Sequence, residues 1–273
     1  MGGRPRWYLR ALAKAWKLSY VKPSMPIIGK VLVKVRAKSF TPENFNISHL
    51  PVNVQIESTN TALPVFILED IIRHSTHRTI IHRCTCREAR QCIRYSVSLG
   101  CLHIGEATEE EDTTVARHIS VEEAIEHLHK AVGAGLIPFM GHAAGDNVIW
   151  NVSRDRPFLT VCFCCPCCCT IFYGYKHLSP EAQATFHRLE GISILINHDK
   201  CIGCSCCAGV CFTGAISIRD NKADRDDTLC KMCGICADFC PQFAVSIHVD
   251  DLDLTVGELF KRINEEVGGL PKK

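Results

Sequence analysis

Eight cysteines in two runs of identical spacing constrain this chain more than any other feature. The runs are Cys201, Cys204, Cys207 and Cys211, and then Cys230, Cys233, Cys236 and Cys240, which Pro241 follows. We call each run a ladder. Both ladders have the spacing C-x2-C-x2-C-x3-C, which is a known ligand pattern for iron–sulfur clusters. The spacing therefore predicts two cluster sites between residues 201 and 240.

The geometry of a [4Fe–4S] cube explains this spacing. Three thiolates from one tight turn can cap one side of the cube, and Gly203 and Gly234 let the backbone approach the sulfides closely. The fourth thiolate must come from outside that turn. Zinc is the alternative, because C-x2-C pairs also bind zinc, but zinc sites do not need two interlocked ladders of four.

Residues 192–250 closely resemble the two-[4Fe–4S] bacterial ferredoxins. The resemblance implies that each ladder gives its fourth cysteine to the cluster of the other. The expected ligands are Cys201, Cys204, Cys207 and Cys240 for the first cluster, and Cys230, Cys233, Cys236 and Cys211 for the second. Phe212 stands where the first ladder of this family usually has proline, so we expect a different local turn and the same ligand count. Cys206 is an extra thiol, either a packing residue or a spare.

The cysteine content as a whole indicates a reducing compartment. The chain has 19 cysteines in 273 residues. Their odd number, their clustering and the lack of a recognisable signal peptide argue against a secreted disulfide protein. We expect a cytoplasmic protein of an anaerobe, since oxygen destroys exposed clusters. No run of eighteen apolar residues is present, so no membrane span is expected.

The basic charge is concentrated in an N-terminal arm. Residues 1–38 contain ten Lys or Arg and no Asp or Glu. Residues 4–22 predict a basic amphipathic helix, with Leu9, Leu12 and Trp16 on its apolar face. Such a helix packs on its own domain, docks into a partner's groove, or lies on the inner face of a membrane. We expect no nucleic acid partner, because no nucleic-acid-binding module accompanies the charge.

Hydrophobic periodicity predicts several elements before the ladders. Helices are expected over residues 65–74 and 87–98, and three more are expected to start at Ser120, Ser179 and Thr255. Ser120 with Glu123, and Thr255 with Glu258, have the spacing of a capping box. Strands are expected over residues 27–38, 78–82, 136–140 and 147–152. Residues 141–147 predict a turn-rich loop.

A second concentration of cysteines lies upstream of the ladders. The candidate ligands are Cys84, Cys86, Cys92, Cys101, Cys162, Cys164, Cys165, Cys167 and Cys168, not all of which are expected to bind. Thiolates at this density repel one another unless a metal compensates their charge. We therefore expect at least one further metal site: a third [4Fe–4S] cluster, a cluster with more than four thiolates, or structural zinc. His82 is a candidate ligand or hydrogen-bond donor to it.

These observations predict an α+β protein. A mixed α/β Cys-rich domain (residues 46–190) would follow the arm (1–45), and a ferredoxin-type domain with a βαβ-like pseudo-repeat (191–250) would precede a last helix (251–273). The Cys-rich half also looks like ferredoxin-fused iron–sulfur proteins of anaerobes whose role is unknown.

The expected function is single-electron transfer between protein partners, through two or three clusters, within a larger oxidoreductase complex. The alternatives are a reductase with an active cluster in the Cys-rich domain, and a subunit for metal or cluster delivery. Whether the chain is an enzyme stays open at this point. No dinucleotide fingerprint or P-loop is present.

Overall fold

The computed structural model describes residues 5–21, 41, 44–51, 54–56 and 61–267. The strand predicted over residues 27–38 lies outside the described residues. Among the residues that are described, no helix is both long enough and apolar enough to cross a bilayer.

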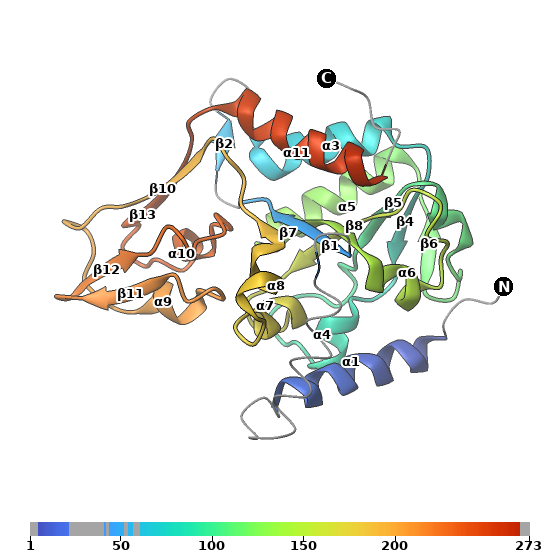
Figure 1. Ribbon diagram of the computed structural model, residues 1–273, viewed down its shortest axis with the longest axis horizontal. Helices are drawn as coiled ribbons and strands as arrows, with labels where there is room; N and C mark the ends of the chain where they lie inside the picture. The colour runs from blue at the N-terminus through green and yellow to red at the C-terminus, as the bar shows by residue number, and fades with distance from the viewer. Residues whose placement is uncertain (1–4, 22–40, 42–43, 52–53, 57–60, 268–273) are drawn as a thin grey trace.

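A seven-stranded sheet forms the centre of the larger domain, which we call the sheet domain (Figure 1). The strand order is β6-β4-β5-β8-β7-β1-β9, and all neighbours are antiparallel except β1 and β9. The strands are β1 (Phe45–His49), β4 (Arg78–Ile81), β5 (Leu102–Ile104), β6 (Ala116–His118), β7 (Ile137–Ala143), β8 (Leu159–Cys164) and β9 (Phe186–His187). A short hairpin of β2 (Gln55–Ile56) and β3 (Thr61–Ala62) lies outside this sheet.

Helices cover both faces of the sheet. Above it in Figure 1 lie α3 (Leu63–His74), α5 (Val121–Gly133) and α11 (Leu252–Val267). Toward the other side lie α1 (Arg6–Val21), α4 (Thr85–Ala89), α6 (Ala144–Trp150), α7 (Thr170–Tyr175), α8 (Pro180–Ala184) and the short 3-10 helix η1 (Glu106–Glu110). Both halves of the predicted capping box of α5 are present, because Ser120 and Glu123 each bond the other's backbone N–H. Ser179 likewise caps α8.

Three predicted elements are wrong, each for a local reason. The helix predicted over residues 87–98 ends at Ala89, and Gln91 takes a left-handed backbone with φ of 51°. Residues 144–150 form α6, where we expected part of a loop and a strand. The last helix starts at Leu252, three residues before the predicted cap, and Asp251 Oδ1 accepts the Leu254 N–H at 2.9 Å.

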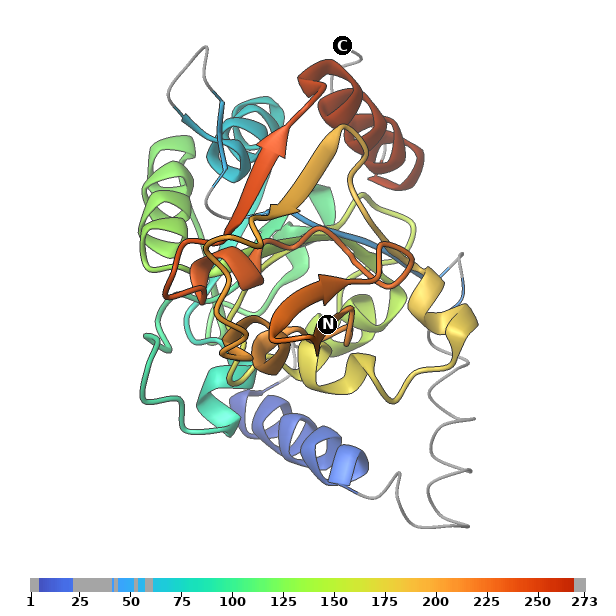
Figure 2. The same cartoon turned by 90° about the vertical axis from the view of Figure 1, so that its left-hand side faces the viewer.

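The ladder unit, residues 192–249, extends from one end of the sheet domain (Figures 1 and 2). It consists of two two-stranded antiparallel sheets and two short helices. One sheet pairs β10 (Ile192–Ile196) with β13 (Val245–Val249), and the other is the hairpin of β11 (Ile216–Arg219) and β12 (Lys222–Arg225); the helices are α9 (Cys206–Val210) and α10 (Ile235–Asp238). Each helix carries the third cysteine of its ladder and follows a residue in the left-handed region, Ser205 or Gly234. The two halves are therefore built alike.

Aromatic side chains join the ladder unit to the sheet domain. Phe212 stacks on Phe172 of α7, with ring centroids 4.4 Å apart and planes at 14°. The rings of Tyr175 and His49 lie 5.1 and 5.0 Å from Phe212. Buried apolar residues of both parts also belong to one continuous core cluster. Phe212, which stands where this family usually has proline, therefore contacts the sheet domain.

Candidate metal centres

The ladder unit brings cysteines of different ladders together. Cys240 of the second ladder lines the same small cavity as Cys201, Cys204 and Cys207 of the first. Backbone N–H groups point at two of these sulfurs, from Ala223 to Cys201 at 3.3 Å and from Ala244 to Cys240 at 3.2 Å. We call these four cysteines the outer group. N–H donors of this kind stabilise thiolates and tune the potential of a bound cluster.

Gly203 is required in the outer group. Its φ is +67°, and a Cβ at this position would lie 2.5 Å from the carbonyl oxygen of Asn221. The chain therefore approaches the hairpin more closely than any side chain permits. The close approach that the sequence predicted for Gly203, toward the sulfides of a cluster, stays a prediction.

The other four ladder cysteines form the inner group: Cys211, Cys230, Cys233 and Cys236. Burial, together with the nearby thiols of Cys230 and Cys211, raises the pKa of Cys236 to about 12. Burial also raises the pKa of Cys233, which has the same two thiols and Cys236 as neighbours. Arg225 donates to Cys230 Sγ at 3.9 Å. Thiols with raised pKa values ionise only when a metal compensates the charge.

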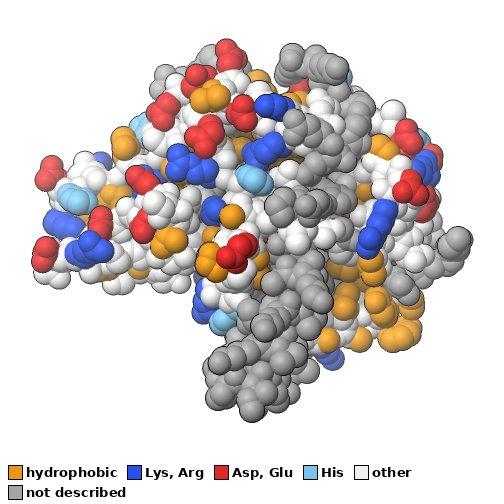
Figure 3. Space-filling model, viewed as in Figure 1, with side chains coloured by type: hydrophobic (Ala, Val, Ile, Leu, Met, Phe, Trp, Pro, Cys, Tyr) orange, Lys and Arg blue, Asp and Glu red, His pale blue; other side chains and the backbone are white. Residues whose placement is uncertain are grey.

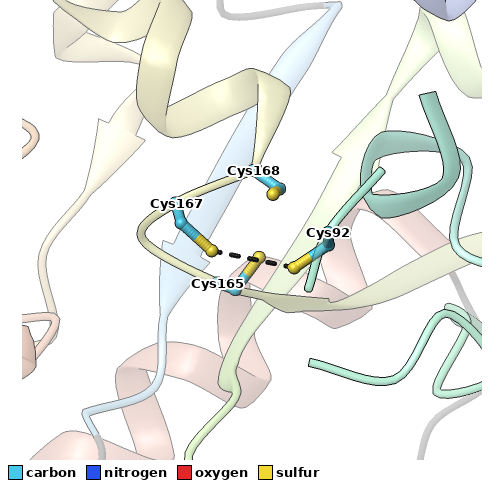
Figure 4. Close-up of side chains that lie close together, drawn as sticks. All are labelled: Cys92, Cys165, Cys167 and Cys168. Atoms are coloured by element: carbon cyan, nitrogen blue, oxygen red, sulfur yellow. Dashed lines mark hydrogen bonds between the residues drawn. The ribbon is translucent and has the colours of Figure 1, made fainter. Parts of the chain in front are cut away.

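Four upstream cysteines form a tight tetrad, shown in Figure 4. The sulfurs of Cys92, Cys165, Cys167 and Cys168 all lie within 4.8 Å of one another. Cys92 Sγ and Cys167 Sγ are 3.8 Å apart. A tetrahedral ion with metal–sulfur bonds of about 2.3 Å separates its ligand sulfurs by about 3.8 Å. A cubane needs more space, because each thiolate binds a different iron. The tetrad therefore fits one metal ion.

The tetrad brings together cysteines from the two upstream stretches, as expected. However, Cys92 lies in a turn and not in the helix predicted over residues 87–98. Cys92 lies in the turn after α4, and the other three lie in the loop between β8 and α7. Burial opposes ionisation of Cys92, but N–H groups of Tyr95 and Arg94 and the nearby thiols lower its pKa to about 7. One ligand of the tetrad is thus readily available as thiolate near neutral pH.

The tetrad adjoins the inner group. A cavity of about 310 Å³ is lined on one side by Pro166 and Cys167, and on the other by Cys211 and Phe212. Phe239 of the ladder unit also lines it, below the guanidinium of Arg94 at 5.6 Å from the ring centroid.

The remaining predicted candidates do not join the tetrad. They line a separate cavity beneath α1: Cys84, Cys86, Cys101, Cys162 and Cys164, together with Cys169. We call these six the thiol ring. Sequence reasoning missed Cys169, although the six-in-eight density of residues 162–169 included it.

The sequence also missed two buried polar residues beside the thiol ring. Arg87 follows Cys86, and His103 lies two residues after Cys101. His103 Nδ1 bonds Glu111 at 2.5 Å; burial disfavours the charged imidazole, but Glu111 and the Cys101 thiol raise its pKa to about 10. His82, the predicted histidine, instead faces the Thr113 carbonyl oxygen at 3.2 Å and is exposed. Nothing in the periodicity distinguished these histidines, because their roles depend on tertiary contacts.

Comparison with known proteins identifies the ladder unit. Residues 194–217 match the family described as 4Fe-4S binding domain. Polyferredoxin protein MvhB of Methanothermus fervidus is 40% identical over 73 residues, which are 26% of this chain and 16% of the relative. Pyruvate synthase subunit PorD of Methanothermobacter marburgensis is 40% identical over 53 residues, 19% of this chain and 62% of the relative.

A further relative belongs to an ion-translocating oxidoreductase complex of Methanosarcina acetivorans, and it is 40% identical over 48 residues, 18% of either chain. The chain spans less than two thirds of the length of each of these three relatives. Each of these similarities covers about a quarter of this chain or less. The chain contains a ferredoxin-type 4Fe–4S binding domain near the end of its sequence.

Proposed function

We propose that this chain is an electron-transfer subunit with two [4Fe–4S] clusters in the ladder unit. The outer group would hold one cluster and the inner group the other. The observation that carries this proposal is the sharing of cysteines: Cys240 lines the cavity of the first ladder, and Cys211 neighbours Cys233 and Cys236 of the second. Each bound cluster would accept and release one electron.

The surroundings of the two groups suggest a direction. Beside the outer group, Ile202 is 61% exposed and Phe243 is 82% exposed. The inner group faces the tetrad and the sheet domain. We infer that an external redox partner docks at the outer group, and that electrons move between it and the inner group.

Charge supports a protein partner. Residues 197–254 carry five Lys or Arg and nine Asp or Glu, and Figure 3 shows charged side chains of both signs over the ladder unit. A net acidic surface attracts a basic partner, and salt weakens that attraction. The relatives' names, a polyferredoxin and components of two oxidoreductases, fit a place in an oxidoreductase complex.

For the tetrad we propose one tetrahedral thiolate-bound ion, zinc or iron. The sulfur separation supports this over the third cubane cluster that we expected from the sequence. The ion would fix the loop of residues 165–168 against the ladder unit. Zinc would be purely structural, whereas iron could also carry an electron.

Reoxidation kinetics test the proposed function. Protein purified without oxygen and reduced by dithionite should be reoxidised rapidly by a basic c-type cytochrome, at a rate that falls as salt rises. Glu substitution of Lys200 and Lys222 should speed this reaction, and the same change at the distant Lys130 should leave it unchanged. A protein that dithionite cannot reduce would refute electron transfer.

A reductase is the second candidate function, and one observation favours it. The thiol ring lines a cavity of about 270 Å³ that also has an apolar wall. Such a cavity could admit a small apolar substrate next to a redox centre. Turnover with reduced protein and candidate acceptors would distinguish this function from simple electron transfer.

Peripheral membrane contact through α1 stays a prediction. The apolar side of α1 packs on its own domain, where Leu9 is buried. Figure 3 shows hydrophobic side chains gathered over the start of α1 and over α6, where Trp7 and Val148 are exposed. Co-sedimentation with anionic vesicles, for wild type and for Trp7→Ser, would test whether this surface binds lipid.

A further inference from the structure

The thiol ring is a second concentration of cysteines, separate from the tetrad. Its members come from the ends of four elements that meet on one side of the sheet. Cys84 and Cys86 belong to the start of α4, Cys101 precedes β5, Cys162 and Cys164 are in β8, and Cys169 caps α7. All six line one cavity of about 270 Å³, whose wall also includes Cys165 of the tetrad. Residues far apart in sequence thus place thiols around a common space.

The sulfurs of the ring form a connected series. Cys101 Sγ and Cys162 Sγ are 3.4 Å apart, and Cys164 Sγ and Cys169 Sγ are 3.1 Å apart. Cys162 and Cys164 share one face of β8, since side chains alternate along a strand, and their thiols are near neighbours. The thiols of Cys84 and Cys86 are near neighbours too.

A buried cation beside the ring lacks a carboxylate partner. Arg87 is 1% exposed and lines the same cavity. Its guanidinium donates to three carbonyl oxygens, those of Ser96, Phe163 and Leu99, and to no carboxylate of the described residues. A buried charge is costly unless an opposite charge lies nearby. The structure therefore provides fixed positive charge where an anionic occupant would need it.

The cavity is too large for one ion. Its volume is about nine times the ~30 Å³ share of one water molecule in the liquid. A single tetrahedral ion uses at most four thiolates and would leave two of the six ring thiols unused. Protein interiors rarely leave so large a space unfilled.

The cavity is also shielded. Leu9 of α1, together with Ile149 and Trp150 of α6, lines the wall away from the thiols. Arg6 and Arg10 of α1 bond Glu88 of α4 at 3.1 and 2.6 Å, which holds α1 in place over the site. A group bound by the ring would therefore be enclosed by protein.

We propose that the thiol ring holds a polynuclear iron–sulfur cluster that Arg87 balances. Thiols as close as those of Cys101 with Cys162, or Cys164 with Cys169, cannot bind different irons, so each close pair would supply one ligand. This site is distinct from the two clusters of the ladder unit and from the single ion of the tetrad. It does not depend on the electron-transfer function, because it rests on the ring's own geometry.

Metal analysis of paired variants tests the proposal. Cys101→Ser with Cys162→Ser should lower the iron and sulfide content by about four atoms each per chain, as expected for one cubane-sized cluster. The matched control, Cys92→Ser with Cys167→Ser, should instead remove one ion from the tetrad and leave the sulfide content unchanged. Unaltered EPR signals of the ladder clusters would show that both variants remain folded.

A second measurement uses only the wild-type protein, in case the ring variants fail to fold. Alkylation of the native protein without oxygen, followed by mass spectrometry, should label the six ring thiols only after a chelator has removed the iron. Three results would overturn the proposal: immediate labelling of all six thiols, zinc in place of iron and sulfide, or a Cys164–Cys169 disulfide.

Discussion

Phe212 of the ladder unit lies parallel to Phe172 of the sheet domain, with ring centroids 4.4 Å apart. Phe212 immediately follows Cys211, an inner-group cysteine, and Phe172 lies four residues after Cys168 of the tetrad. The stack therefore fixes the distance between two candidate metal centres. A proline at position 212 would end the ladder without making this contact.

Replacing Phe212 should loosen the ladder unit from the sheet domain. An aromatic pair contributes about 0.5–1.5 kcal/mol beyond the burial of its area. We expect Phe212→Leu to lower the free energy of unfolding by about that amount, because leucine keeps apolar contact without the stack. Phe212→Pro should cost more and should increase hydrogen exchange in α7. Unchanged exchange in α7 for both variants would contradict a docking role; Phe243→Leu, at an exposed phenylalanine, is the control.

His49 should make this interface sensitive to acid. Burial, and to a lesser extent Lys231, lowers its pKa from 6.5 to about 3, and neither ring nitrogen has a hydrogen-bond partner among the described residues. The folded protein therefore keeps His49 neutral while the unfolded chain takes up a proton below pH 6.5. The stability from this residue is full about one unit above that pH, and it falls by about 1.4 kcal/mol between pH 7.5 and pH 5.5.

His49→Leu should remove this pH dependence. Denaturant unfolding at pH 7.5 and pH 5.5 measures the effect in both proteins. Wild type should lose about 1.4 kcal/mol more than His49→Leu between these two pH values. Equal losses in the two proteins would show that His49 is protonated in the fold.

The sequence predicted iron–sulfur binding better than it predicted the backbone structure around the upstream cysteines. The ladder spacing indicated iron–sulfur binding, which the 4Fe-4S binding domain match supports. The upstream cysteines were predicted to form at least one further site, and the structure separates them into a tetrad and a ring. Periodicity could not separate them, because the turn at Gln91 directs Cys92 away from the α4 cysteines. Arg87 likewise was not singled out in the sequence, because only the tertiary fold buries it.

Arg225 should raise the potential of the inner cluster. Its guanidinium lies 3.9 Å from Cys230 Sγ, and a nearby positive charge favours the reduced, more negative state. Arg225→Gln should therefore lower one reduction potential by tens of millivolts and leave the outer one unchanged. An EPR-monitored redox titration measures both. Arg219→Gln, at an exposed arginine on the same hairpin, should shift neither potential. If Arg225→Gln shifts only the potential of the outer cluster, our assignment of the two potentials to the two clusters is reversed.

Glu88 should hold α1 over the thiol ring. Its Oε1 accepts from Arg6, Arg10 and Arg83; although burial opposes ionisation, these arginines lower its pKa to about 2. Glu88→Gln should weaken all three contacts and raise hydrogen exchange in α1 severalfold at neutral pH. Glu126→Gln, at an exposed helical pair with Lys130, is the matched control. Equal exchange in α1 for both variants would mean that apolar packing alone holds this helix.

The exchange of the fourth cysteine between the ladders is the central claim, and EPR of four serine variants tests it most directly. The account predicts that Cys240→Ser alters the same reduced-cluster signal as Cys204→Ser. It also predicts that Cys211→Ser alters the same signal as Cys233→Ser, and that each pair leaves the other signal intact. If Cys240→Ser instead shares its signal with Cys233→Ser, and Cys211→Ser with Cys204→Ser, each ladder holds its own cluster and the account is wrong.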